Sequence, residues 1–315
     1  MTKKSIQKWI LILLKRIIFV SACLYLLWRF FIDDSLNFQS NVFDIFNIQS
    51  IIFLIIVLIL VFFNWLIESF KWKAALQNLT PLSTKRSFTG VLFGLSVSIL
   101  TPNRSGECVG RLWVLPENTR IKAFATTVVA NFSQFLITII FGIIALFFFK
   151  DNITLPVYFE LKNSHFYIAG LLLLIAFLFF LFYSKIKKVN FFKRFVSSFE
   201  VIKSWNYRTI SKLLIFSILR YIIFVIQFWL LLIVFQTPIS FVNVYSGIGV
   251  MYLIMALLPI LTIAEPAVRC ELSVYLLSIY NPCEAGIMAA ALVLWTVNVA
   301  IPAVIGSIWL NFYKD

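Results

Sequence analysis

The stretch FTGVLFGLSVSILTPNRSGECVGR (residues 88–111) decides how the chain is folded. It begins with fourteen largely apolar residues and becomes polar and charged directly after Pro102. A helix needs about 20 apolar residues to cross the hydrocarbon core of a bilayer, and proline interrupts a helix. The stretch therefore predicts a re-entrant hairpin over 88–116, which dips into a membrane and returns on the same side.

A second stretch of the same kind lies in the other half of the chain. VYSGIGVMYLIMALL (244–258) has fifteen residues before Pro259, and the polar and charged segment PILTIAEPAVRCE (259–271) follows it. We predict a second re-entrant hairpin over 244–281.

The composition requires a membrane around these hairpins. Apolar residues make up 62% of the 315 residues and charged residues only 13%, which is too little polar surface for a water-soluble fold. Six longer apolar windows can each cross about 30 Å of hydrocarbon: 9–31, 48–69, 121–149, 166–183, 209–235 and 286–311. The predicted fold is an all-α polytopic membrane protein, one transmembrane domain over 1–315 with six full spans and two hairpins.

The distribution of positive charge tests this topology. The chain carries 27 Lys and Arg against 13 Asp and Glu, a net charge of +14. A cytoplasmic N-terminus, six crossing windows and two returning hairpins put 22 of the 27 cations on the cytoplasmic side, and only Lys150 and Lys162 in outer loops. This asymmetry is the positive-inside pattern. We therefore expect a cell inner (plasma) membrane protein with both termini cytoplasmic, and no nucleic-acid partner.

The same topology divides the chain into two halves of opposite orientation. The first half, 1–150, consists of two spans, a hairpin from the inside and a third span. The second half, 166–315, has this order with its hairpin entering from the outside. Inverted repeats of this kind are a recurrent transporter design. Between the halves, the basic amphipathic segment 185–208 is predicted to lie on the cytoplasmic membrane surface as a connector.

Each hairpin carries a Glu–Arg pair shortly after its proline. Glu107 and Arg111 are four residues apart, as are Glu265 and Arg269, and this spacing favours an ion pair on a helix. Two such pairs at matching places in inverted halves indicate one shared polar cavity, to which Arg104 would also contribute. The alternative for the first pair is a simple ionic staple at the membrane interface.

Other residues would shape that cavity. Gly106 and Gly110 give the first hairpin a small-residue face that allows close backbone approach. Arg220 lies within a predicted span, where a charge costs about 2.5–3.5 kcal/mol. It therefore needs a partner, and Glu107 or Glu68 is nearest in depth; the alternative is that Arg220 snorkels to the membrane surface.

A further group of polar residues lies within one of the long apolar windows. Asn131, Ser133 and Gln134 form a polar cluster within 121–149 that we expect to serve helix packing.

The single histidine, His165, and the absence of nucleotide-binding, serine-hydrolase and zinc-protease motifs predict no cofactor, no metal and no catalytic residue.

Together the charged residues suit a phosphate group. The cavity would contain four positive and three negative charges: those of Arg104, Arg111, Arg220 and Arg269, and those of Glu107, Glu265 and Glu271. A surplus positive charge beside helix N-termini and glycine backbone favours phosphate binding. The predicted substrate-binding residues are Arg104, Glu107, Arg111, Arg220, Glu265 and Arg269. The predicted structural residues are Glu68, Pro102, Gly106, Gly110 and Pro259.

The chain resembles the transmembrane-domain family of lysylphosphatidylglycerol synthetase/flippase proteins. The resemblance is carried, in order along nearly the whole chain, by NWLIESFKWKAAL (64–76), TPNRSGECVGR (101–111), ANFSQ (130–134) and TIAEPAVRCE (262–271). It implies a membrane domain that moves lipids between leaflets, and it points to Glu68, Pro102, Arg104, Gly106, Glu107, Arg111, Glu265 and Arg269.

The chain also departs from that family's pattern. Asn103 stands where a glycine often follows the first motif proline. Glu265-Pro266-Ala267 replaces the glycine-rich second motif of the lysyl-lipid branch. The chain lacks the soluble aminoacyl-transferase domain, so we expect no lysyl-lipid synthesis.

Three functions follow from these features. The first is a flippase-like protein that binds a membrane phospholipid or another anionic lipid, with its oligomeric state open. The second is an intramembrane enzyme acting on lipid phosphates, for which Ser105, Cys108 and Glu107 are the nearby reactive groups. The third is a non-transporting scaffold of envelope assembly.

Overall fold

The computed structural model describes residues 47–99, 101, 103–149, 204–237, 239–258, 260–280 and 283–313, which form helices and no strand. Several predictions lie outside these residues: the windows 9–31 and 166–183, the connector 185–208 up to residue 203, Pro102 and Pro259.

Four helices are long and apolar enough to cross a membrane. They are α2 (Ile48–Leu76), Glu117–Phe149, which contains α5 (Arg120–Phe149), α9 (Tyr207–Val234), and Glu284–Phe312. They coincide with four of the six predicted windows. The helix α2 continues well past the predicted end at residue 69, because its last turns pack inside the protein.

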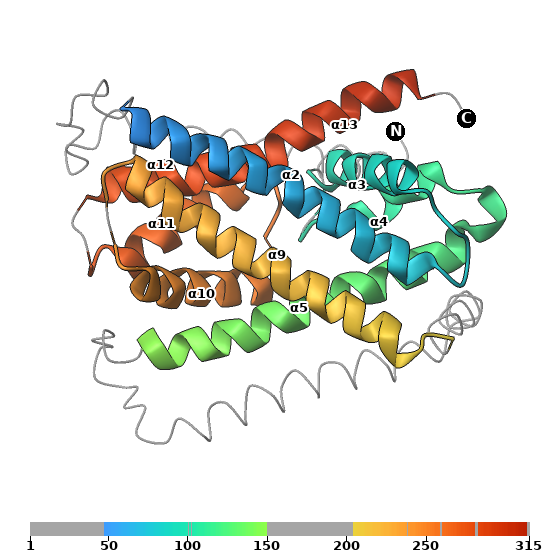
Figure 1. Ribbon diagram of the computed structural model, residues 1–315, viewed down its shortest axis with the longest axis horizontal. Helices are drawn as coiled ribbons and strands as arrows, with labels where there is room; N and C mark the ends of the chain where they lie inside the picture. Colours follow the sequence, from blue (N-terminus) through green and yellow to red (C-terminus); the bar gives the residue numbers. More distant parts are fainter. Residues whose placement is uncertain are drawn as a thin grey trace, which may run out of the picture.

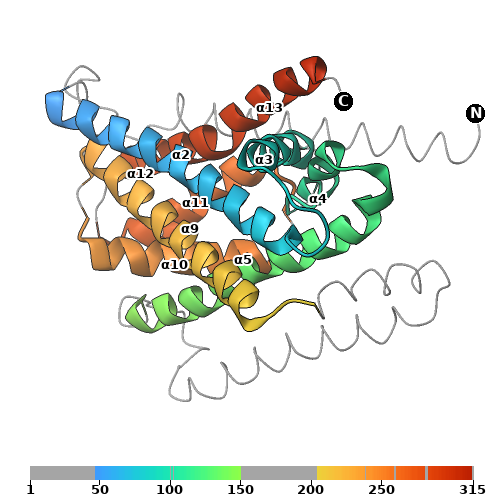
Figure 2. The same ribbon diagram turned by 45° about the vertical axis from the view of Figure 1, so that its right-hand side comes forward.

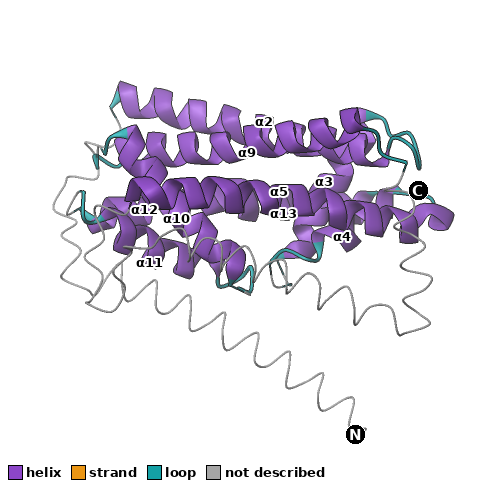
Figure 3. Cartoon of the chain, turned by 90° about the horizontal axis from the view of Figure 1, so that it is seen from below, coloured by secondary structure: helices purple, strands orange, loops and turns teal. Residues whose placement is uncertain are grey.

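Two pairs of short helices stand between the long ones. The helix α3 (Thr84–Ser98) packs against α4 (Glu107–Gly110) and the 3₁₀ turn η2 (Arg111–Val114). The helix α10 (Phe241–Leu257) packs against α11 (Glu265–Leu277). The two pairs lie towards opposite ends of the molecule's long axis (Figures 1 and 3).

The long and short helices pack in a reciprocal way. The helix α10 of the second half lies against α5 of the first half, and α3 of the first half lies against α13 (Ile301–Phe312) of the second. The helices α2 and α9, which open the described part of each half, lie side by side (Figures 1 and 2). Each half therefore contributes its first short helix to the other.

The last long helix is interrupted by one π-helical segment. Between α12 (Glu284–Trp295) and α13, residues Thr296–Ala300 form a π turn. Such turns are rare and often occur at functional sites. Here the turn carries Asn298, which is 4% exposed, into the interior between α2 and α9.

Candidate functional site

The loops that follow α3 and α10 meet at the centre of the protein. The amide of Asn103 donates to the carbonyl oxygen of Ile260 at 2.9 Å, and the amide of Ile260 donates back to Asn103 Oδ1 at 2.9 Å. The hydroxyl of Thr262 donates to the carbonyl oxygen of Thr101 at 2.8 Å. These bonds join two loops that are about 160 residues apart in the chain.

The backbone at Asn103 and Arg104 is left-handed. Their φ angles are 46° and 55°, a region that glycine enters freely and that asparagine tolerates better than most residues. Asparagine is therefore well suited to position 103.

Arg104 reaches from the first loop to the second. Its guanidinium donates to both carboxylate oxygens of Glu265, at 2.8 to 3.3 Å. Glu265 also accepts from Arg269 at 2.6 Å, one helical turn along α11, and Arg269 donates in turn to the Tyr252 hydroxyl at 3.4 Å. We name Arg104, Glu265 and Arg269 the loop cluster.

A second charged cluster is centred on Glu68 of α2. Lys71 lies 2.7 Å and Arg111 2.8 Å from its carboxylate, and Arg220 of α9 pairs with it as well. Arg111 also pairs with Glu107 at 2.9 Å. We name these five residues the Glu68 cluster. It joins α2, the first loop and α9, and Arg220 reaches one of its two expected partners, Glu68.

A chain of buried amides supports Arg220. The guanidinium Nε of Arg220 donates to Asn64 at 2.8 Å, Asn64 donates to Asn298 at 3.1 Å, and Asn298 donates to Gln227 at 3.2 Å. The π turn places Asn298 within reach of both amide partners. The arginine is therefore held in one orientation by groups that do not themselves line the cavity.

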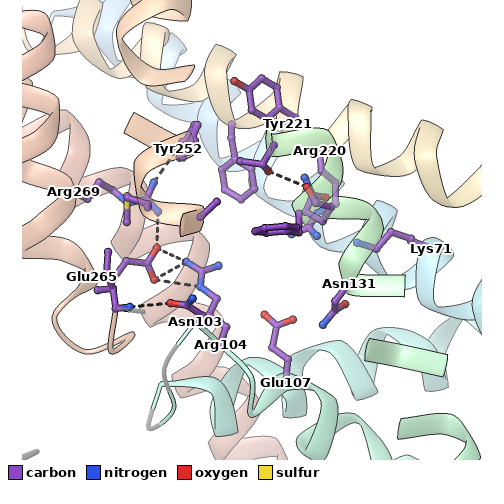
Figure 4. Close-up of a pocket in the computed structure, with 17 residues that line it drawn as sticks. Lys71, Asn103, Arg104, Glu107, Asn131, Arg220, Tyr221, Tyr252, Glu265 and Arg269 are labelled. Carbon is purple, nitrogen blue, oxygen red and sulfur yellow. Dashed lines mark hydrogen bonds and ion pairs between the residues drawn. The ribbon is translucent and has the colours of Figure 1, made fainter. Parts of the chain in front are cut away.

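The two clusters face a cavity of about 320 Å³ (Figure 4). Arg104 and Glu265 lie on one side of it, Lys71 and Arg220 on another, and Glu107 and Asn131 close a third. Its lining is formed by Lys71, Asn103, Arg104, Glu107, Asn131, Gln134, Phe135, Thr138, Arg220, Tyr221, Phe224, Tyr252, Met255, Ala256, Ile260, Glu265 and Arg269.

The structure brings five of the six predicted binding residues to the cavity wall. These are Arg104, Glu107, Arg220, Glu265 and Arg269. The sixth, Arg111, is 1% exposed and lies behind the wall between Glu68 and Glu107. It can therefore hold the two glutamates in place, but it does not line the cavity. Glu271 is not part of the lining.

The glycines of the first loop allow the close packing there. A Cβ atom on Gly110 would lie 2.3 Å from the carbonyl oxygen of Phe93, and one on Gly106 would lie 2.7 Å from that of Val97. Both distances are far below van der Waals contact, so only glycine fits against α3 at these two places.

Sequence reasoning missed several residues of the site. Lys71 was counted among the cytoplasmic charges, yet it is 1% exposed inside the protein; its position three residues after Glu68 was the available signal. Part of the predicted packing cluster does pack against α9: Ser133 bonds Ser217 at 2.9 Å, and Gln134 donates to the Ser217 carbonyl oxygen at 3.3 Å. Asn131 and Gln134 also line the cavity, which was not predicted.

Fold and site together define a multi-pass helical membrane protein with a charged cavity where two helix-breaking loops meet. The chain belongs to the family described as the lysylphosphatidylglycerol synthase TM region, which matches residues 12–306. No curated protein and no solved structure matches the chain.

Proposed function

We propose that the protein is a flippase-like transporter that moves a phosphate-bearing lipid headgroup between membrane leaflets. The headgroup would occupy the cavity between the loops while the acyl chains stay in the bilayer. The observation that carries this proposal is the cavity itself, where cations outnumber carboxylates at the junction of the two loops. Family membership supports a role with membrane lipids.

The proposed topology has six spans and two re-entrant hairpins in inverted halves, within the cell inner membrane and with cytoplasmic termini. Two features of the fold support it. The short-helix pairs lie towards opposite ends of the molecule (Figure 1), as expected for hairpins that enter from opposite leaflets. Reciprocal packing of α10 on α5 and of α3 on α13 is the relation that a two-fold axis between the halves would produce.

Transport in this scheme requires the halves to move against each other. Arg104, Arg220 and Arg269 would hold the phosphate-bearing headgroup, and Glu107 and Glu265 would orient those arginines. The bonds between the loops would close the cavity, and their separation would open it to one side. Rocking of one half against the other is the usual route to alternating access around a central site.

The test is lipid movement in vesicles. We would reconstitute the purified protein into liposomes that contain a fluorescent phosphatidylglycerol, and follow the fraction that a membrane-impermeant reductant quenches. Wild-type protein should expose the inner-leaflet label, and Glu107→Ala or Arg111→Ala should abolish this. Arg208→Gln is the matched control, because Arg208 is exposed at the start of α9, outside both clusters.

Other outcomes would identify the alternatives. Full transport in both cluster variants would remove the proposed site. Release of a headgroup by the purified protein would indicate an intramembrane enzyme. An envelope defect that tolerates neutral substitutions in the cavity, but not substitutions of surface residues within 185–205, would indicate a scaffold.

A further inference from the structure

The surplus positive charge around the cavity is divided between the two clusters. The loop cluster contains two arginines and one carboxylate. The Glu68 cluster contains three cations and the two carboxylates of Glu68 and Glu107. Within the described part of the chain, each cluster therefore has one more positive charge than negative charge. Glu68, Lys71, Arg111, Glu265 and Arg269 are buried, whereas Arg104, Glu107 and Arg220 are partly buried, and an uncompensated charge in such a setting is costly.

Both clusters keep hydrogen-bond donors for a ligand. Arg104 uses Nε and Nη2 on Glu265, and Arg220 uses Nε and Nη1 on Asn64 and Glu68. The remaining guanidinium nitrogens, Nη1 of Arg104 and Nη2 of Arg220, make no hydrogen bond with described residues. Lys71 is 1% exposed and pairs with Glu68, but its ammonium has no well-directed hydrogen bond among the described residues.

These donors approach the cavity from different sides. Arg104 comes from the first loop, whereas Arg220 and Lys71 come from α9 and α2, with open space between them (Figure 4). A single phosphodiester carries one negative charge on one phosphorus. It can neutralise one cluster, but it leaves the surplus charge of the other cluster without a counter-ion.

We propose, on the basis of the proposed function, that the cavity recognises two phosphate groups in series: the headgroup of a lipid diphosphate. One phosphate lies against Arg104 of the loop cluster, and the other lies against Arg220, with the charge of the buried Lys71 ammonium nearby. The apolar part of the lining, Phe135, Phe224 and Met255, favours the start of a hydrocarbon chain over a free inorganic anion.

Binding of short-chain probes to the detergent-purified protein tests this proposal. Isothermal titration calorimetry would compare farnesyl diphosphate, farnesyl monophosphate and inorganic diphosphate. We expect farnesyl diphosphate to bind at least about tenfold more tightly than either of the others. Equal affinity for farnesyl monophosphate and farnesyl diphosphate would overturn the two-phosphate proposal. Equal affinity for inorganic and farnesyl diphosphate would overturn the assignment to a lipid.

Variants locate the two contacts. Arg104→Gln and Arg220→Gln should each reduce the preference for diphosphate over monophosphate to near unity, because each leaves one charged contact. Arg104 is the more exposed of the two, with 24% of its side chain accessible, so its variant keeps the test available if Arg220→Gln does not fold. Arg208→Gln should keep the preference, and unchanged preference in Arg104→Gln would contradict the assignment.

The vesicle assay separates this inference from the function on which it rests. Transport of fluorescent phosphatidylglycerol without any diphosphate preference in binding would overturn the inference and leave the transporter intact. Failure to bind or move any phosphate-bearing lipid would overturn both.

Discussion

Glu68 has three cationic neighbours in a buried setting, and this makes it the most sensitive single residue of the site. We predict that Glu68→Gln leaves Lys71, Arg111 and Arg220 close together around a neutral amide. Loss of one partner from a buried ion pair costs about 3–5 kcal/mol. The variant should therefore unfold at a clearly lower temperature, measured by tryptophan fluorescence in detergent.

The control uses another glutamate that pairs with an arginine. Glu117 is 89% exposed at its side chain and lies 3.4 Å from Arg120. An exposed pair contributes about 0–1 kcal/mol, so Glu117→Gln should hardly change the unfolding temperature. Equal effects of the two substitutions would show that the Glu68 cluster does not stabilise the fold.

Asn103 combines a left-handed backbone with a side-chain bond to the other loop. We predict that Asn103→Leu destabilises the protein by about 2 kcal/mol, because leucine is strained at positive φ and cannot accept from the Ile260 amide. Asn103→Gly should cost less, since it loses the acceptor but relieves the backbone. Thermal unfolding of the two variants measures the difference, and the reverse order would contradict this explanation.

Residue spacing predicted only the ion pairs between residues that are close in the sequence. Glu107–Arg111 and Glu265–Arg269 were predicted from their four-residue separation, and both ion pairs are present. The pair between Arg104 and Glu265 was not predicted. It joins two loops whose contact depends on the packing of whole helices, which no local spacing encodes.

At the scale of elements, α3 and α4 pack closely because Gly110 has no side chain. We predict that Gly110→Ala separates α4 from α3, since its Cβ would lie 2.3 Å from Phe93 O and 2.8 Å from Gly94 Cα. Overpacking of this kind costs about 1–3 kcal/mol, and the shift should disturb Glu107 and Arg111. Transport and thermal unfolding should both be reduced.

A neighbouring substitution is the control for this effect. Val109 lies on the same short helix but is 47% exposed. Val109→Ala should leave unfolding and transport close to wild type. If Gly110→Ala behaves like Val109→Ala, close packing of α3 and α4 is not needed.

Helix positions were predictable where apolar length decides them. Four windows are long helices in the structure, three of them with nearly the predicted bounds, and the helices α3 and α10 end before the prolines. The window for α2 was too short, because it ended at residue 69, before Lys71 and Lys73, whereas the helix runs to Leu76. Lys71 pairs with Glu68, about one turn earlier in the same helix. The first charged residue after the apolar window therefore lies in the protein interior.

At the scale of the whole molecule, the two halves are joined through their loops. The order of long and short elements in each half could be predicted from apolar length. The packing of α10 on α5 and of α3 on α13 could not be predicted, because the apolar residues of a helix face do not specify which other helix packs against it. The loop contact at Thr101 and Thr262 is where movement of the halves can be tested.

We predict that a covalent link between the loops stops transport but not lipid binding. Thr262 bonds the backbone of Thr101 at 2.8 Å through its hydroxyl, so the two positions are close enough to attempt a disulfide. Thr101→Cys with Thr262→Cys, in a background with Cys23, Cys108, Cys270 and Cys283 replaced by alanine, would supply it. If alternating access requires the loops to part, the oxidised protein should retain bound lipid in mass spectrometry yet leave the vesicle label protected.

The link provides its own control, because reduction restores the free thiols without any further change in sequence. Transport should return on reduction, and each single-cysteine variant should transport under both conditions. Mass spectrometry of alkylated protein gives the linked fraction, against which the transport rate is plotted. A fully linked protein that still moves lipid would show that the two loops stay together during transport, and that the lipid passes through the protein by another movement.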